Sequence, residues 1–160
     1  MSRHFGGSAE LESRTELTKR LKTFFDRQRL AVLSTQKRNR PYASLVAFAV
    51  TDDFKSFVFA TPRTTRKYAN IMASSRAALL IDNRSNRASD FRKAMAVTAV
   101  GTVRELRKSP RNRLIRLYTD KHSHLKDFVK SPTCAVMCLE AETLHIVDRF
   151  QHVIELHLDR

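Results

Sequence analysis

The apolar positions near the N-terminus of the chain follow a helical period. Their spacing predicts an amphipathic helix over residues 14–28. The helix is expected to begin at Ser13, because Ser13 and Glu16 have the S-x-x-E spacing of a capping box. The apolar positions that repeat at this spacing are Leu17, Leu21, Phe24 and Phe25.

Beyond residue 28 the apolar positions form short runs separated by polar turns, which predicts strands. The first three strands are expected to form an antiparallel meander. The run YASLVAFAVT at residues 42–51 is apolar at both odd and even positions, so we expect it to be buried on both faces. Gly101 inside a later run predicts a bulge or a close backbone approach. The predicted strands cover residues 30–34, 42–51, 56–61, 77–82, 94–106, 134–139, 143–150 and 152–158.

Few helices are expected among these strands. Thr65 is the predicted N-cap of a short helix over residues 66–73. The pair Ser109-Pro110 is expected to open a helix that ends near residue 120, and a further short helix is predicted around residues 125–129. The chain is therefore expected to be mainly β, and closure of the sheet into a barrel would remove its exposed edges.

The size and composition fit a single domain with a substantial core. The chain has 160 residues, of which 42% are hydrophobic, so we expect one domain over residues 13–160 after a flexible N-terminal arm, residues 1–12. No apolar run is long enough to span a bilayer, and the N-terminal residues lack the features of a signal peptide, so a cytoplasmic protein without a membrane partner is expected. Cys134 and Cys138 lack metal-ligand spacing and are expected to be free core thiols, with no metal site.

Charge changes this picture, because the net charge of +14 predicts an anionic ligand of some kind. The segment from Phe59 to Lys67 concentrates three cations and three hydroxyls where a predicted strand leads into a predicted helix. A helix N-terminus normally attracts carboxylates, yet this segment contains none. A phosphate would satisfy the helix N–H groups, the hydroxyls and the cations together. Solvated basic side chains are the alternative, because 30 of the 160 residues are Lys or Arg.

This segment resembles the phosphate-binding stretch of the pyridoxamine 5'-phosphate oxidase-like, FMN-binding split-barrel family. In that family a strand ending in Thr is followed by Ser/Thr-Arg-Lys at the start of a short helix, matched here by Thr61 and by Thr65-Arg66-Lys67. The run PYASLVAF at residues 41–48 is similar to the second strand of the family's first hairpin. The resemblance covers residues 28–107 and implies an antiparallel, Greek-key split β-barrel.

The resemblance also implies a flavin site and a homodimer. In this family the flavin lies at the dimer interface, so a second subunit would complete each site, and a nicotinamide or another small reductant would supply electrons. The residues that would hold the FMN phosphate are Thr61, Thr65, Arg66 and Lys67. The residues that would line the isoalloxazine ring, largely through backbone groups, are Ser44, Leu45 and Val46. A polar loop that would contribute to the site comprises Asn83, Arg84, Ser85 and Asn86.

Some departures from the oxidase pattern favour a relative with an unknown substrate. The oxidase carries basic residues on the strand before the phosphate segment, whereas residues 43–47 here contain none, and its C-terminal substrate signature is absent. We therefore interpret the chain as an FMN-binding oxidoreductase of this family without the vitamin-converting activity. A non-enzymatic flavin or haem carrier and a deazaflavin-dependent reductase remain open alternatives.

The histidines are weaker candidates for haem ligands, and a second basic run is a weaker candidate for a nucleic-acid site. Haem-handling relatives of this fold use C-terminal histidines, but His145, His152 and His157 are expected to be structural or exposed. His122 and His124 are expected to face solvent. The basic run from Arg104 to Arg116 would suit a nucleic acid, but no aromatic residue is interleaved with it, so we interpret it as a solvated surface.

Overall fold

The computed structural model describes residues 12–159, so most of the expected N-terminal arm lies outside the described residues. Helix α1 (Arg14–Arg27) begins at the predicted capping box: Glu16 N–H donates to Ser13 Oγ, and Ser13 N–H donates to the Glu16 carboxylate, both at 3.1 Å. The residues of α1 that are buried are the predicted Leu17, Leu21, Phe24 and Phe25.

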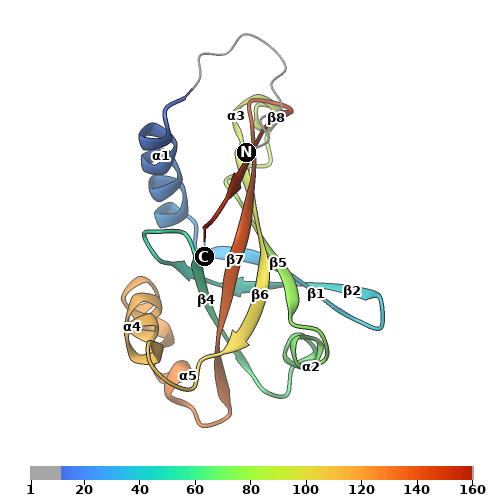
Figure 1. Cartoon of the computed structure of the whole chain (residues 1–160), viewed down its shortest axis with the longest axis vertical. Coiled ribbons are helices and arrows are strands. Elements are labelled where there is room, and N and C mark those ends of the chain that lie inside the picture. Colours follow the sequence, from blue (N-terminus) through green and yellow to red (C-terminus); the bar gives the residue numbers. More distant parts are fainter. Residues whose placement is uncertain (1–11, 160) are drawn as a thin grey trace.

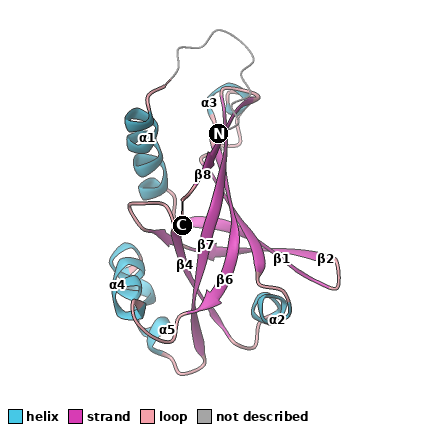
Figure 2. Ribbon diagram, viewed as in Figure 1, coloured by secondary structure: helices cyan, strands magenta, loops and turns pink. Residues whose placement is uncertain are grey.

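The remainder of the chain forms one strongly curled sheet, in which every strand pair is antiparallel. The strand order is β2-β1-β5-β6-β7-β4-β3, and β8 pairs with β7. Because β2 and β3 follow one another in the chain but occupy opposite ends of this order, the sheet must curl back on itself (Figures 1 and 2). This is the mainly β, split-barrel architecture that was expected. The strands are β1 (Leu30–Lys37), β2 (Arg40–Ala47), β3 (Ala49–Val50), β4 (Ser56–Pro62), β5 (Arg76–Asp82), β6 (Ala96–Glu105), β7 (Cys134–Asp148) and β8 (His152–His157).

Three strand predictions need correction. The predicted strand 42–51 divides at Phe48 into β2 and β3, which lie at opposite ends of the sheet order, so the expected three-strand meander becomes two hairpins. The expectation that residues 42–51 are buried on both faces is also wrong, because the Leu45 side chain is 64% exposed on β2. The two strands predicted over residues 134–150 form one continuous strand, β7.

The helices lie outside the curled sheet. Helix α2 (Arg66–Ala73) matches its predicted bounds and begins after Thr65, whose Oγ1 accepts a hydrogen bond from Tyr68 N–H at 3.3 Å. In α4 (Arg111–Lys121) the N-cap is Pro110 rather than Ser109, and no side chain caps the helix. Short helix α3 (Asp90–Lys93) lies next to the predicted loop and was missed by the sequence pattern. A 3-10 turn, Ser123–Leu125, leads into α5 (Lys126–Lys130).

Two hydrophobic clusters fill the structure. The larger one lies inside the curl, where Phe25 of α1 packs against Phe48, between β2 and β3, and against Phe57 of β4. The smaller one lies between the sheet and helices α4 and α5, and it includes Leu114, Tyr118 and Cys138. Both cysteines are buried free thiols, as predicted. Among the described residues, no helix is both long and apolar enough to cross a membrane.

One face of the sheet carries exposed apolar side chains, and we call it the open face. Directly opposed residues of antiparallel strands point to the same face. The register therefore carries the open face from Leu45 on β2, through Leu80 on β5, to Val147 on β7 and Val153 on β8. The Leu45 and Val153 side chains are 64% and 55% exposed. Exposed apolar groups gathered in this way are typical of an interaction surface.

Candidate phosphate-binding site

The predicted phosphate segment folds as a compact corner between β4 and α2. Thr61 is fully buried near the end of β4, and its Oγ1 lies 2.7 Å from the Oγ1 of Thr65. The Thr65 hydroxyl donates to Pro62 O at 3.0 Å and accepts from Tyr68 N–H. The two hydroxyls that sequence reasoning selected therefore meet at the N-terminal end of α2.

The cations of the first turn of α2 have no acidic partner among the described residues. Arg66 is exposed, and its guanidinium Cζ lies 5.2 Å from the centre of the Tyr42 ring. Lys67 is half-buried beside it, and the first turn of α2 contains no acidic residue. Cations at the positive end of a helix dipole raise the local potential, so this corner is electrostatically suited to an anion.

Ser44 lies next to this corner with an unsatisfied hydroxyl. It is two residues from Tyr42 and therefore on the same face of β2, and its Oγ is buried without a hydrogen-bond partner. Such a group normally has a partner. Val46 shares this face and is buried, whereas the side chain of Leu45 points to the open face. Because β2 pairs only with β1 among the described strands, its outer edge leaves backbone groups free for a ligand.

A residue that sequence reasoning missed holds the corner in place. Glu105, at the end of β6, is largely buried and pairs with Arg63, while it accepts a hydrogen bond from the Tyr68 hydroxyl at 3.1 Å. Arg63 also donates to Pro132 O at 2.8 Å, so its guanidinium is already occupied by partners within the chain. Burial opposes ionisation of Glu105, but hydrogen bonds from Arg63, Arg107 and Tyr68 hold its pKa below the usual range. A single acid in a strand offers no sequence signal for this role.

A second interaction that was not predicted fixes α2 against the first hairpin. The buried Asn70 side chain donates from Nδ2 to Thr35 Oγ1 at 3.1 Å. Thr35 is itself buried on β1. Together with the contact between Arg66 and the Tyr42 ring, this hydrogen bond positions α2 against the β1–β2 hairpin.

The predicted polar loop does not join this corner within one chain. Asn83–Asn86 follows β5 at the end of the molecule where α3 lies, whereas α2 lies toward the opposite end (Figure 1). Its side chains organise the loop itself: Asn83 accepts from Met95 N–H at 2.7 Å, and the Ser85 hydroxyl donates to Asp90 at 2.7 Å. Arg84 pairs with Asp82 at 3.0 Å. A role for this loop in the same site stays a prediction that requires a second subunit.

The histidines occupy structural or exposed positions. His152 Nδ1 lies 2.6 Å from Asp148, and His157 Nε2 lies 3.1 Å from Glu155. The expectation that His122 faces solvent is wrong: it is 1% exposed, and its Nε2 lies 2.7 Å from Phe48 O. Burial lowers the pKa of His122, so the neutral ring is favoured. Within residues 12–159 no group of three or more acidic, His or Cys side chains is arranged to hold a metal ion.

Comparison with known proteins identifies the fold over most of the chain. Residues 17–148 match the family model described as pyridoxamine 5'-phosphate oxidase. No curated protein shows significant sequence similarity to the chain.

Solved structures extend this comparison at low sequence identity. A structure of a haem-binding protein from Mycobacterium smegmatis has a TM-score of 0.79 and 15% identity, over 91% of this chain and 60% of that protein. The present chain thus spans less than two thirds of that protein's length. A protein related to general stress protein 26 from Clostridium acetobutylicum has a TM-score of 0.68 and 17% identity, over 89% and 95% of the two chains. HutZ, a haem storage protein from Vibrio cholerae, has a TM-score of 0.70 and 12% identity, over 82% and 93%. Because the sequence identities are this low, the comparison with these structures shows a shared fold and no more.

Proposed function

Because the chain belongs to the pyridoxamine 5'-phosphate oxidase family, as its match over residues 17–148 shows, we propose that it is an FMN-binding oxidoreductase. One observation carries the proposal: the Thr61 and Thr65 hydroxyls meet at a helix N-terminus whose cations have no carboxylate partner among the described residues. A helix N-terminus, cations and nearby hydroxyls are the groups that favour binding of a phosphate.

The residues divide the work of binding between the two ends of the cofactor. Arg66 and Lys67 would pair with the phosphate. The hydroxyls of Thr61 and Thr65, which bond to each other and to Pro62 O here, would rotate to donate to the phosphate oxygens. The unpaired Ser44 hydroxyl and the open backbone edge of β2 would contact the isoalloxazine ring. The flavin would supply the redox chemistry, with a nicotinamide or another small reductant as the electron donor. The protein would orient the ring and keep water from its buried face.

We propose that the functional form is a homodimer. The open face offers apolar side chains at Leu45, Val147 and Val153 that would be covered by a second copy. The same association could bring the polar loop Asn83–Asn86 of one subunit toward the phosphate corner of the other, which would explain why that loop lies apart from the corner within one chain.

The test of the flavin site is an FMN titration of the Arg66→Ala/Lys67→Ala variant. The free energy of FMN binding should weaken by several kcal/mol, because each hydrogen bond to a charged group contributes about 1.5–3 kcal/mol. The matched control is Lys126→Ala/Lys130→Ala, which removes the same charge from exposed positions of α5. Unchanged FMN affinity in the first variant, or an equal loss in the control, would contradict the assigned phosphate site.

A second candidate function is haem binding, which one feature of the chain favours. A hollow of about 590 Å³ beside the open face is lined by apolar residues such as Met95 and Val153. Its charged lining residues are Arg84 and the carboxylates Asp82, Asp90 and Asp148. Arg84 is already paired with Asp82, so it is the apolar lining, not the charge, that suits a flat ligand such as haem. Two similar structures are named as haem-binding and haem-storage proteins. An absorption spectrum of the purified protein separates the candidates, because flavin bands support the first and a Soret band the second. A deazaflavin would occupy the same phosphate corner as FMN. A competition titration of the two cofactors would show which one the protein binds more tightly.

A further inference from the structure

A second basic site lies where β6 leads into α4, apart from the phosphate corner. A concavity of about 600 Å³ opens here, and the charged side chains that line it are all cationic. They are Arg107, Lys108, Arg111, Arg113 and Arg116. Ser109 and Asn112 add a hydroxyl and an amide to the same lining. Five cations from one ten-residue segment therefore face a single hollow of small-ligand size.

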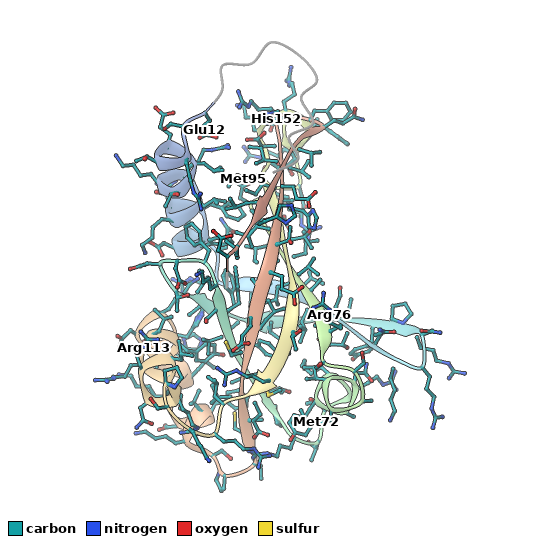
Figure 3. The ribbon with its side chains drawn as sticks, viewed as in Figure 1. Glu12, Met72, Arg76, Met95, Arg113 and His152 are labelled. Carbon is teal, nitrogen blue, oxygen red and sulfur yellow. The ribbon has the colours of Figure 1, made fainter. Side chains whose placement is uncertain are left out.

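The charges of this concavity are poorly neutralised within the described structure. The neighbouring carboxylate, Glu105, is shared between Arg63 and Arg107 and also accepts from a tyrosine hydroxyl. Lys108, Arg113 and Arg116 have no ion-pair partner among residues 12–159, and Figure 3 shows Arg113 on the outer side of α4. Like charges held close together repel one another, so an anion in the hollow would relieve the repulsion.

The start of α4 adds to the same potential. Its N-cap, Pro110, offers no side-chain acceptor, and its first turn contains no acidic residue. Arg111 N–H donates to Lys108 O at 2.9 Å, so the N–H groups of Asn112 and Arg113, together with the positive end of the helix dipole, are the ones available to an anion at the edge of the concavity.

We propose that this basic concavity binds a compact polyphosphate, either inorganic or the phosphate end of a nucleotide. Several adjacent phosphates match five clustered cations better than one phosphate does, and guanidinium groups bind phosphate oxygens in pairs. No aromatic side chain lines the hollow, and Tyr118 further along α4 is buried, so bases would have no stacking platform. The ligand is thus recognised by its phosphates alone, and a nucleic acid is the less suitable occupant.

The experiment is a calorimetric titration of the full-length protein with inorganic tripolyphosphate at near-physiological salt. Saturable binding is expected, and Arg113→Ala/Arg116→Ala should weaken it by about tenfold or more, because two charged contacts are lost. ATP should bind with the same affinity as tripolyphosphate. The matched control is Arg92→Ala/Lys93→Ala on α3, at the other end of the molecule (Figure 1). The affinity of this control for tripolyphosphate should fall by less than about twofold, because distant exposed charges are screened.

Several outcomes would overturn the polyphosphate site. These are the absence of saturable binding, an equal loss in the α3 control, and a clear preference for a single-stranded oligonucleotide of matched charge. The FMN titration keeps this proposal separate from the flavin site. Arg113→Ala/Arg116→Ala should bind FMN as the wild type does, and a protein that binds tripolyphosphate but not FMN would contradict only the proposed function.

Discussion

At the residue scale, Gly101 shows how closely the two longest strands approach. The register of β6 against β7 shifts between Val100 and Gly101. A Cβ built on Gly101 would lie only 1.9 Å from Glu140 O, a backbone atom that cannot move aside without displacing β7. Glycine is required here for space, and the predicted bulge and close approach are both confirmed.

The Gly101→Ala variant is therefore expected to be destabilised. Forcing atoms into a filled site costs about 1–3 kcal/mol, and more where the obstacle is backbone. Urea denaturation of the wild type and the variant, fitted with one shared denaturant dependence, would measure the decrease in the free energy of unfolding. Thr98→Ala, on the same strand and half-buried, is the control and should cost no more than about 1 kcal/mol. A Gly101→Ala protein as stable as the control would show that β7 can shift freely.

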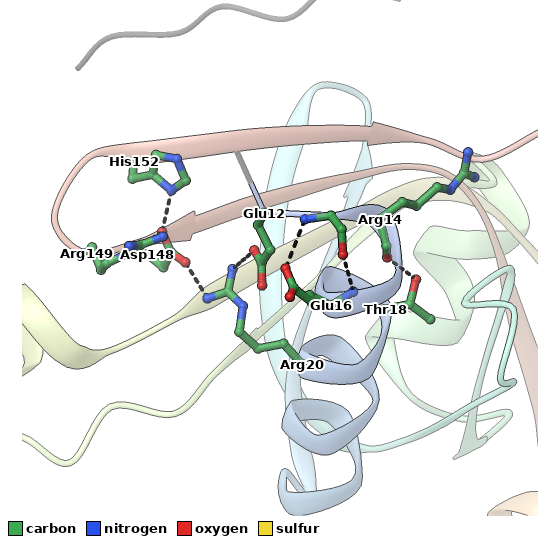
Figure 4. Close-up of polar contacts among 9 residues, drawn as sticks. Glu12, Arg14, Glu16, Thr18, Arg20, Asp148, Arg149 and His152 are labelled. Carbon is green, nitrogen blue, oxygen red and sulfur yellow. Dashed lines mark hydrogen bonds and ion pairs between the residues drawn. The ribbon is translucent and has the colours of Figure 1, made fainter. Parts of the chain in front are cut away.

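At the element scale, a buried charge cluster attaches α1 to the β7–β8 turn. Asp148 is 4% exposed and accepts from Arg20 of α1 at 2.5 Å and from His152 at 2.6 Å, while Arg20 also pairs with Glu12 at 2.9 Å (Figure 4). The turn itself places Arg149, Phe150 and Gln151 at positive φ, although none is glycine. Such a turn needs support from its surroundings, and Asp148 supplies it.

We expect Asp148→Asn to lower the free energy of unfolding by about 1.5–3 kcal/mol at neutral pH, because a hydrogen bond to a charged group is lost. Burial opposes ionisation, but Arg20 and His152 hold the pKa of Asp148 below 3.8. A depressed carboxyl pKa contributes stability that is present above the unfolded value and lost as the pH falls through the folded one. The gap between wild type and variant, measured by thermal or urea unfolding, should therefore shrink below about pH 4. A gap independent of pH would contradict this role.

At the scale of the whole molecule, the curl of the sheet leaves the open face without a cover. Helix α1 closes one end of the interior and α4 with α5 cover another part of the sheet, whereas Leu45 and Val153 remain exposed. If two copies associate through this face, a charged substitution there should prevent dimerisation and weaken FMN binding together, because each site would lose its second subunit.

The Leu45→Arg/Val153→Arg variant tests this association. Its mass in light scattering should correspond to a monomer, whereas the wild type should be a dimer, because unpaired charges in an apolar interface cost several kcal/mol. Met72→Arg on α2 is the control, since Met72 is another exposed apolar residue that does not belong to the open face. A variant that stays dimeric would assign the interface to another surface.

Features that depend on a few neighbouring residues were predictable from the sequence. The capping box of Ser13 and Glu16, the start of α2 after Thr65 and the special position of Gly101 all follow from local backbone chemistry. The mainly β class was also predicted, because alternation and turn residues are local patterns. The phosphate-binding role of the corner at α2 stays a prediction.

Tertiary structure alone decided which distant segments meet. Phe48 divides an apolar run because its two halves pair with different strands, so the half that forms β2 becomes an exposed edge. Glu105 reaches Arg63 across 42 positions of sequence, and Asn83–Asn86 lies far from the corner that it was expected to join. The pattern of apolar residues along the sequence indicates how much of a strand can be buried. The curl of the sheet determines which neighbours cover each face.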